Sequence, residues 1–104
     1  MNRPYLYVQA PLDFTKPSAP LPVVWVRVAR EVAAIYDLPV SAVLGRSRLR
    51  TAALARHHGW FELRERYGLS WPEIARAVGV KCHGSVMQGA KSFARAAGIV
   101  GWRG

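Results

Sequence analysis

Polar and cationic side chains recur at helical spacing near the C-terminal end of this 104-residue sequence. Gly84, Gln88, Lys91 and Arg95 are three or four residues apart, so a helix would place them on one face. The amide on such a face can form paired hydrogen bonds with a base edge, while the cationic side chains can bind phosphates at the rim of a groove. The alternative interpretation is an ordinary solvated helix face, which uses the same residue types.

A second group of candidate anion ligands lies upstream, where Arg46, Arg48 and Arg50 alternate along a predicted loop. Three arginines this close together repel one another unless an anion lies among them. The formal net charge is +9 and the isoelectric point is about 10.9. This charge predicts a polyanionic partner, most simply a nucleic acid, although charge alone does not separate DNA from RNA or a membrane surface.

The sequence contains no pattern that predicts an enzyme, a metal site or a cofactor site. One cysteine excludes an internal disulfide, and three unevenly spaced histidines do not fit a zinc finger. The phosphate-binding pattern G-x-x-x-x-G-K-[ST] is absent, and no nucleophile or carboxylate pair can be assembled. Without an apolar run of transmembrane length or a leader, we expect a cytoplasmic protein that is associated with the nucleoid if DNA is its partner.

The polar face belongs to a predicted helix-turn-helix over residues 70–97. Ser70 and Glu73 can cap each other's backbone amides at the start of the first helix, and Gly79 supplies the positive φ that ends it. The second helix carries an apolar stripe for the core at i, i+4, i+7, i+8 and i+11, formed by Val86, Ala90, Phe93, Ala94 and Ala97.

Three further helices are predicted upstream. Residues 23–36 are ambiguous, because the valine-rich start favours a strand whereas the spacing of the apolar residues favours a helix. A short helix runs from Pro39 to Leu44, and a long one starts near Thr51, a possible N-cap, and continues to Tyr67. Within the long helix, Gly59 predicts a close approach by another element, and His57 and His58 are expected at the surface or on phosphates.

The two ends of the chain are expected to lie outside this domain. Residues 1–22 hold five of the seven prolines and predict an extended arm. Residues 98–104 form a tail in which Gly98 ends the last helix and Ile99, Val100 and Trp102 fold back on the core. The domain boundaries are therefore 1–22, 23–97 and 98–104.

Residues 79–91, GVKCHGSVMQGAK, resemble the signature of the C-terminal DNA-binding domain (domain IV) of the bacterial replication initiator DnaA. Members of that family read there approximately Gly-Gly-Arg-Asp-His-Ser/Thr-Thr-Val-Leu-His-Ala-x-Arg/Lys. The resemblance extends upstream and covers about Val23 to Ala97. It implies an all-α, Trp-repressor-like helix-turn-helix domain that binds double-stranded DNA, and it favours a helix over residues 23–36. Because the phosphate-binding pattern is absent, we expect this domain to stand alone without the ATPase that accompanies it in DnaA.

The resemblance also implies which side chains touch DNA. In the DnaA family an arginine of the basic loop enters the minor groove, and this position falls on Arg48. Arg50 and Arg56 fall on basic positions that serve phosphates. With the polar helix face, the expected DNA-binding residues are Arg46, Arg48, Arg50, Arg56, Lys81, His83, Gly84, Ser85, Gln88 and Lys91.

Three departures from the family pattern predict a changed base preference. Cys82 replaces the aspartate that caps the recognition helix, which costs about 1 kcal/mol unless Ser85 or the turn compensates. Gly84 replaces a hydroxyl residue that can touch a base. Gln88 replaces a histidine and supplies an amide that can pair with adenine.

Several functions remain open at the level of sequence. The first is a sequence-specific regulator of transcription in a phage, prophage or gene-transfer-agent system, because known gene-transfer-agent activators carry such domains. The alternatives are a replication-initiation or origin-binding protein and a protein-interaction module. With no heptad or second apolar face, we expect a monomer, with a transcription or replication protein as a possible further partner.

Overall fold

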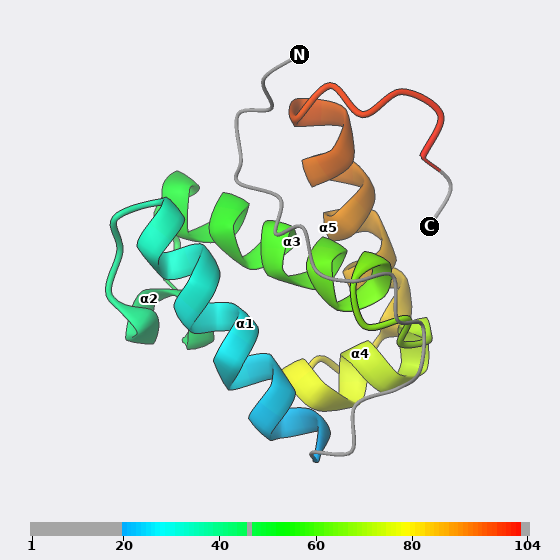
Figure 1. Ribbon diagram of the computed structural model, residues 1–104, viewed down its shortest axis with the longest axis horizontal. Coiled ribbons are helices and arrows are strands. Elements are labelled where there is room, and N and C mark those ends of the chain that lie inside the picture. Colours follow the sequence, from blue (N-terminus) through cyan, green and yellow to red (C-terminus); the bar gives the residue numbers. More distant parts are fainter. Residues whose placement is uncertain (1–19, 46, 103–104) are drawn as a thin grey trace.

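The computed structural model describes residues 20–45 and 47–102. These ranges contain no strand and form five helices, α1 (Leu21–Ile35), α2 (Val40–Leu44), α3 (Arg50–Glu65), α4 (Trp71–Val78) and α5 (His83–Ala96). The predicted all-α fold is therefore confirmed. Helix α3 runs through the middle of the molecule, with α1 on one side and α5 on the other (Figure 1). Most of the predicted arm, together with Arg46 and Arg103, lies outside the described residues.

Helix α1 settles the ambiguity over residues 23–36 in favour of a helix, which starts two residues earlier than expected. Pro22 lies in its first turn, where a missing backbone N–H costs nothing. Val24, Val28 and Val32 recur every four residues and are buried, and Trp25 joins them in the core. Helical spacing thus outweighs the β-propensity of valine, because one face of α1 buries its side chains against the neighbouring helices.

Helix α3 forms the centre of the core. It begins at Arg50, with Leu49 rather than Thr51 in the N-cap position, so the expected hydroxyl cap is wrong. The close approach expected at Gly59 is confirmed, because a Cβ atom there would lie 2.6 Å from Cζ3 of Trp25. This glycine lets the indole of α1 pack directly on the backbone of α3.

His58 is completely buried, so its expected place at the surface is wrong. Its ring stacks on Phe93 of α5 with the ring centroids 4.2 Å apart. The Nδ1 atom lies 3.1 Å from the hydroxyl oxygen of Tyr36, and the Nε2 atom lies 3.6 Å from a carboxylate oxygen of Glu62. A buried polar ring needs such partners, and Tyr36 and Phe93 come from positions 22 and 35 residues away in the chain.

The helix-turn-helix forms as predicted. The hydroxyl oxygen of Ser70 accepts a hydrogen bond from the Glu73 amide at 3.2 Å, and the Glu73 carboxylate accepts one from the Ser70 amide at 2.8 Å. Gly79 ends α4 with a φ of 79°. The apolar stripe of α5 then enters the core through Val86, Ala90, Phe93 and Ala94.

The C-terminal segment returns to the core only in part. Gly98 follows the last helix with a φ of 77°, and the indole N–H of Trp102 donates to Glu65 at 2.8 Å. Ile99 packs against the core, but Val100 is 96% exposed, which contradicts its expected burial. No helix among the described residues is long and apolar enough to cross a membrane.

Candidate nucleic-acid interface

The outer face of α5 carries the polar side chains that the sequence singled out. His83, Ser85 and Gln88 are exposed on it, while Gly84 and Lys91 are half-buried. A hollow of about 830 Å³ runs along this face and reaches the side of α3. It is lined by His57, Trp60, Cys82, Gly84, Ser85, Gln88, Gly89, Ser92 and Arg95. Amide, hydroxyl and cationic groups therefore share one surface, as readout of a groove requires.

The position of α5 is set by a close contact with α3. A Cβ atom at Gly89 would lie 2.5 Å from Cζ3 of Trp60 and 2.8 Å from Cδ2 of His57. Only the absence of a side chain lets the Trp60 ring lie against the backbone of α5 there. Because Gly89 follows Gln88 directly, this contact also fixes how far Gln88 stands out from the body of the protein.

A second hollow, of about 790 Å³, lies between the loop before α3 and the turn before α5. Ser47 and Arg48 line it from the loop, and Val80 and Lys81 line it from the turn. Its other lining residues are Trp25, Val43, Leu44, Gly45, Arg56, Trp60, Val78 and Gly79. The fold thus brings together two cationic segments that are more than 30 residues apart in the sequence.

The interface is cationic, and three carboxylates of the described chain have their partners elsewhere in the fold. None of the described residues that line the two hollows is an aspartate or a glutamate. Glu31 and Glu62 lie beside Arg66, and Glu73 caps α4. Among the described residues, Arg48, Lys81 and Arg95 form no ion pair with a carboxylate, which favours a polyanion at this surface.

Arg56 has protein partners that its position in the sequence does not reveal. Its Nε atom donates to the Val43 carbonyl at 3.3 Å, and its Nη2 atom donates to the carbonyls of Ala42 at 3.3 Å and Ser47 at 3.1 Å. Burial lowers the pKa of its guanidinium below the ordinary value. These bonds link α3 to the end of α2 and to the loop that carries Arg48, so the side chain that was expected to bind a phosphate is already engaged within the protein.

The other expected loop residues take different positions. Arg50 is exposed at the first residue of α3, and Arg48 is exposed two residues before it. Arg46 lies outside the described residues. The hydroxyl oxygen of Ser47 accepts a hydrogen bond from the Leu49 amide at 3.3 Å, which shapes the loop between them.

The start of α5 lacks a side-chain cap. Cys82 occupies the N-cap position and makes no capping hydrogen bond, as its chemistry predicts. The first backbone amides of α5, beside the exposed His83, therefore receive no hydrogen bond from the N-cap side chain. Such amides favour an anion, and here they adjoin Lys81 at the edge of the second hollow.

His57 lies beside α5, a position that no periodicity in the sequence indicates. It is half-buried next to Trp60, with ring centroids 5.2 Å apart, and it lines the same hollow as Ser85 and Gln88. Burial, followed by the charge of Arg56, lowers the pKa of His57 below its ordinary 6.5. The imidazole is therefore mostly neutral at pH 7 and presents a hydrogen-bonding ring rather than a charge.

Among residues 20–45 and 47–102, no group of three or more histidine, cysteine, aspartate or glutamate side chains is arranged to hold a metal ion. What the surface offers instead is hydrogen-bonding groups on one helix and cationic side chains on the flanking loop and turn.

Comparison with known proteins agrees with this geometry. Residues 26–92 match the model of the family described as bacterial DnaA protein helix-turn-helix. The chain is 36% identical over 67 residues to a chromosomal replication initiator protein DnaA of Roseiflexus castenholzii, covering 64% of this chain and 14% of that protein. It is 43% identical over 56 residues to a chromosomal replication initiator protein DnaA of Synechocystis, covering 54% of this chain and 12% of that protein. No solved structure matches the chain significantly.

Proposed function

The chain belongs to the bacterial DnaA helix-turn-helix family and is a DNA-binding protein, and from this premise we propose that it recognises a specific sequence in double-stranded DNA. The observation that carries the proposal is the hollow between the loop and the turn, which has Arg48 on one side and Lys81 on the other. A strand of DNA backbone that crosses this hollow would place one groove at the loop and the next groove at α5.

In this arrangement α5 reads the major groove. Gln88 and Ser85 stand out from the part of the helix nearest the turn, and a glutamine amide can form two hydrogen bonds with adenine. Gly84 has no side chain to hold the helix away from the bases. Lys91 lies further along the helix, where phosphates at the rim of the groove are within reach, and His83 and Lys81 lie near the phosphates at its start.

The loop before α3 supplies the second set of contacts. Arg48 enters the minor groove, where a narrow A·T-rich step deepens the negative potential that attracts a guanidinium. Arg46 and Arg50 flank it and bind phosphates on either side. Arg56 contributes mainly by positioning the loop, because its guanidinium donates hydrogen bonds to the carbonyls of Val43 and Ser47.

We further propose that the protein regulates transcription in a phage, prophage or gene-transfer-agent system. Replication initiation or origin binding fits the family equally well, since both relatives are named as replication initiators, although this chain spans only about an eighth of their length. Chromatin immunoprecipitation across the genome separates the two roles. Enrichment upstream of transcribed genes supports the regulator, whereas enrichment confined to the replication origin supports the alternative.

The proposed readout is tested by selecting binding sites from randomised duplexes with the wild type and with Gln88→Ala. Loss of the amide should cost about 1–3 kcal/mol on the preferred site and remove the preference at one base pair, while non-specific affinity changes little. Arg27→Ala is the matched control, because Arg27 is exposed on α1 and lines neither hollow. If Gln88→Ala selects the same motif as the wild type, α5 is not the reading helix.

Two physical measurements test the remaining parts of the proposal. With about six phosphates neutralised, the logarithm of the binding constant should fall against the logarithm of salt concentration with a slope of about −5. A slope near zero would contradict nucleic-acid binding. Sedimentation should give a monomer on an asymmetric site, and a tight dimer without DNA would contradict this stoichiometry.

A further inference from the structure

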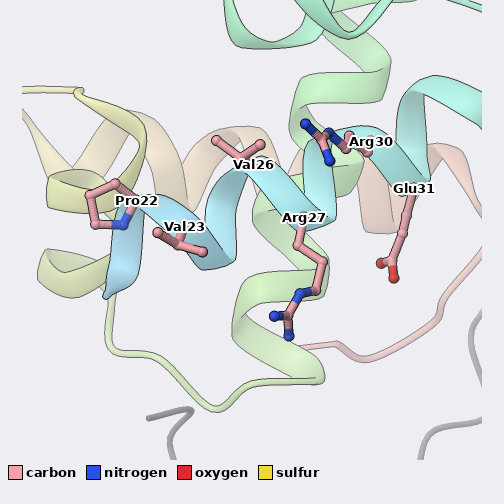
Figure 2. Close-up of a pocket in the computed structure, with 6 residues that line it drawn as sticks. All are labelled: Pro22, Val23, Val26, Arg27, Arg30 and Glu31. Carbon is pink, nitrogen blue, oxygen red and sulfur yellow. The ribbon is translucent and has the colours of Figure 1, made fainter. Parts of the chain in front are cut away.

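The outer side of α1 carries a groove that neither the core nor the DNA interface uses. Six residues line a shallow depression of about 650 Å³ there, and all belong to α1. They form two rows at i, i+4 spacing, with Pro22, Val26 and Arg30 in one row and Val23, Arg27 and Glu31 in the other. In Figure 2 the side chains of Val26 and Arg30 project from one edge of the helix, and those of Val23, Arg27 and Glu31 project from the opposite edge.

This geometry is the one that accepts another helix. Rows of side chains at i±4 spacing form ridges, and the commonest helix packing places a ridge of one helix in the groove between two such ridges of the other. Here the groove is apolar at its N-terminal end, where Val23 is 50% exposed beside Pro22 and the half-buried Val26. A helix docked there would cover apolar surface that now faces water.

The C-terminal end of the groove is positively charged. Arg27 and Arg30 are exposed, and within the described part of the chain neither pairs with a carboxylate. Glu31, the acid on this face, already accepts a hydrogen bond from Arg66 at 2.8 Å. Arg66 also donates to the hydroxyl oxygen of Tyr67 at 2.8 Å, so Glu31 is held toward α3 and does not neutralise the two arginines.

The groove is separate from the surface that faces DNA. None of its six residues lines either hollow of the candidate interface. Helix α1 contacts α2, α3 and α4, whereas the reading helix α5 packs chiefly on α3 and α4 (Figure 1). A ligand on the outer side of α1 therefore does not compete with a duplex held by α5.

We propose that the outer face of α1 is a docking site for an acidic amphipathic helix of a partner protein. The apolar residues of that helix lie between the two ridges at Val23 and Val26, and its carboxylates meet Arg27 and Arg30. The two arginines, unpaired within the described chain, favour an acidic partner, and the groove between the two i, i+4 ridges has the shape that a ridge of another helix fits. This proposal does not depend on DNA binding.

Other occupants fit the face less well. A second copy of α1 would bring two more arginines to the face, and its Glu31 is already paired with Arg66, so it offers no free carboxylate to Arg27 and Arg30. A membrane-surface helix needs bulky apolar side chains, and this face offers only proline and valine to a lipid phase. A phosphate backbone would leave Val23 without an apolar partner and would meet the Glu31 carboxylate.

The test uses a synthetic 16-residue helical peptide as the probe, with leucine at i, i+4 positions and glutamate beside them. It is titrated into the ¹⁵N-labelled full chain already saturated with duplex DNA, so that the DNA interface is occupied. Two control peptides replace all glutamates by lysine or all leucines by serine. We expect a dissociation constant of about 10–100 µM for the acidic amphipathic probe, with chemical-shift changes centred on residues 22–31.

Charge-reversed variants locate the contact. Arg27→Glu with Arg30→Glu should weaken peptide binding at least about tenfold and leave DNA affinity within about twofold, and neutral Arg27→Gln with Arg30→Gln should show a smaller loss in the same direction. Lys91→Glu with Arg95→Glu should instead weaken DNA binding, because these residues lie on α5. Its affinity for the peptide, titrated without DNA, should stay close to that of the wild type. Circular dichroism melts verify that each variant is folded.

Three outcomes would overturn the proposal. Shift changes centred on α5 and the Arg48 loop would mean that the peptide only imitates DNA. Equal binding of the serine control would mean that charge alone is recognised. Binding of anionic phosphatidylglycerol vesicles through Arg27 and Arg30, with no binding of the peptide below 1 mM, would assign the face to a membrane.

Discussion

Replacing Arg56 with lysine separates two roles that a cation at this position can have. Lysine keeps the positive charge, so a phosphate anchor would survive the change. It cannot reproduce the fork with which the guanidinium reaches the carbonyls of Ala42, Val43 and Ser47. If Arg56 acts by holding the loop, Arg56→Lys should therefore lose much of the stability that Arg56→Ala loses, although it keeps the charge.

The geometry sets the size of the effect. The three hydrogen bonds of Arg56 measure 3.1–3.3 Å, at or beyond the long end of the normal range, and the side chain is only partly buried. We therefore assign about 1 kcal/mol to each bond rather than the larger values of short charged bonds. Lysine can keep one of the three, so its net loss in the free energy of unfolding is about 1–2 kcal/mol. For a domain of this size, that lowers the melting temperature by roughly 4–16 °C.

The assay combines thermal unfolding with selection of binding sites from randomised duplexes. Arg50→Lys is the matched control, because Arg50 is exposed at the start of α3 and its change should move the melting temperature by no more than about 3 °C. Arg56→Lys should also lose the A·T preference next to the site, the effect expected of Arg48→Ala if Arg48 enters the minor groove, because the loop is no longer held. If Arg56→Lys retains both the wild-type melting temperature and the wild-type motif, charge alone suffices and Arg56 is a phosphate anchor.

Three further substitutions test the placement of α5 and its surroundings. Gly89→Ala should lower the free energy of unfolding by about 1–3 kcal/mol despite the better helix propensity of alanine, because the new Cβ meets Trp60 at 2.5 Å. The measurement is urea unfolding, and a gain in stability would contradict that contact. Cys82→Asp should raise stability by about 1 kcal/mol by capping α5, measured in the same way, and an unchanged midpoint would mean that the cap is not formed. His57→Gln should remove part of the pH dependence of unfolding. Burial, and after it the charge of Arg56, lowers the pKa of folded His57 below the 6.5 of the unfolded chain. The wild type should therefore lose stability as the pH falls below about 6.5. Identical profiles of stability against pH for the two proteins between pH 5 and 8 would refute this.

The helix-turn-helix could be predicted because its signals are local. The capping box joins Ser70 to Glu73, and the left-handed conformation belongs to Gly79 itself. The stripe that begins at Val86 repeats within a single helix. Each of these depends on backbone dihedral angles and on neighbours within about one turn, which the order of residues determines directly. The resemblance to the DnaA family then extended this local pattern to the whole domain.

Polar residues of α3 show where local signals stop. The sequence places His57, His58 and Arg56 side by side on one helix, and nothing in their spacing distinguishes their environments. In the fold, His58 is buried against Phe93, His57 lines the hollow along α5, and Arg56 holds a loop. Their partners come from other helices, so only packing decides which side chain is enclosed and which remains at the surface.

The residue pattern determined four of the five described helices, and the family resemblance decided the helix over residues 23–36; the predicted boundaries lie within about two residues of those observed. The pattern also determined the cationic character of the chain and the face that α5 turns outward. Tertiary structure alone decided that the Arg48 loop and the Lys81 turn border one hollow, and that α1 presents an unused groove at Val23 and Arg27. The physical reason is the separation along the chain over which each kind of interaction acts. Helix caps and periodicity act over three or four residues, whereas a binding surface is assembled from segments that only burial of the shared core brings together.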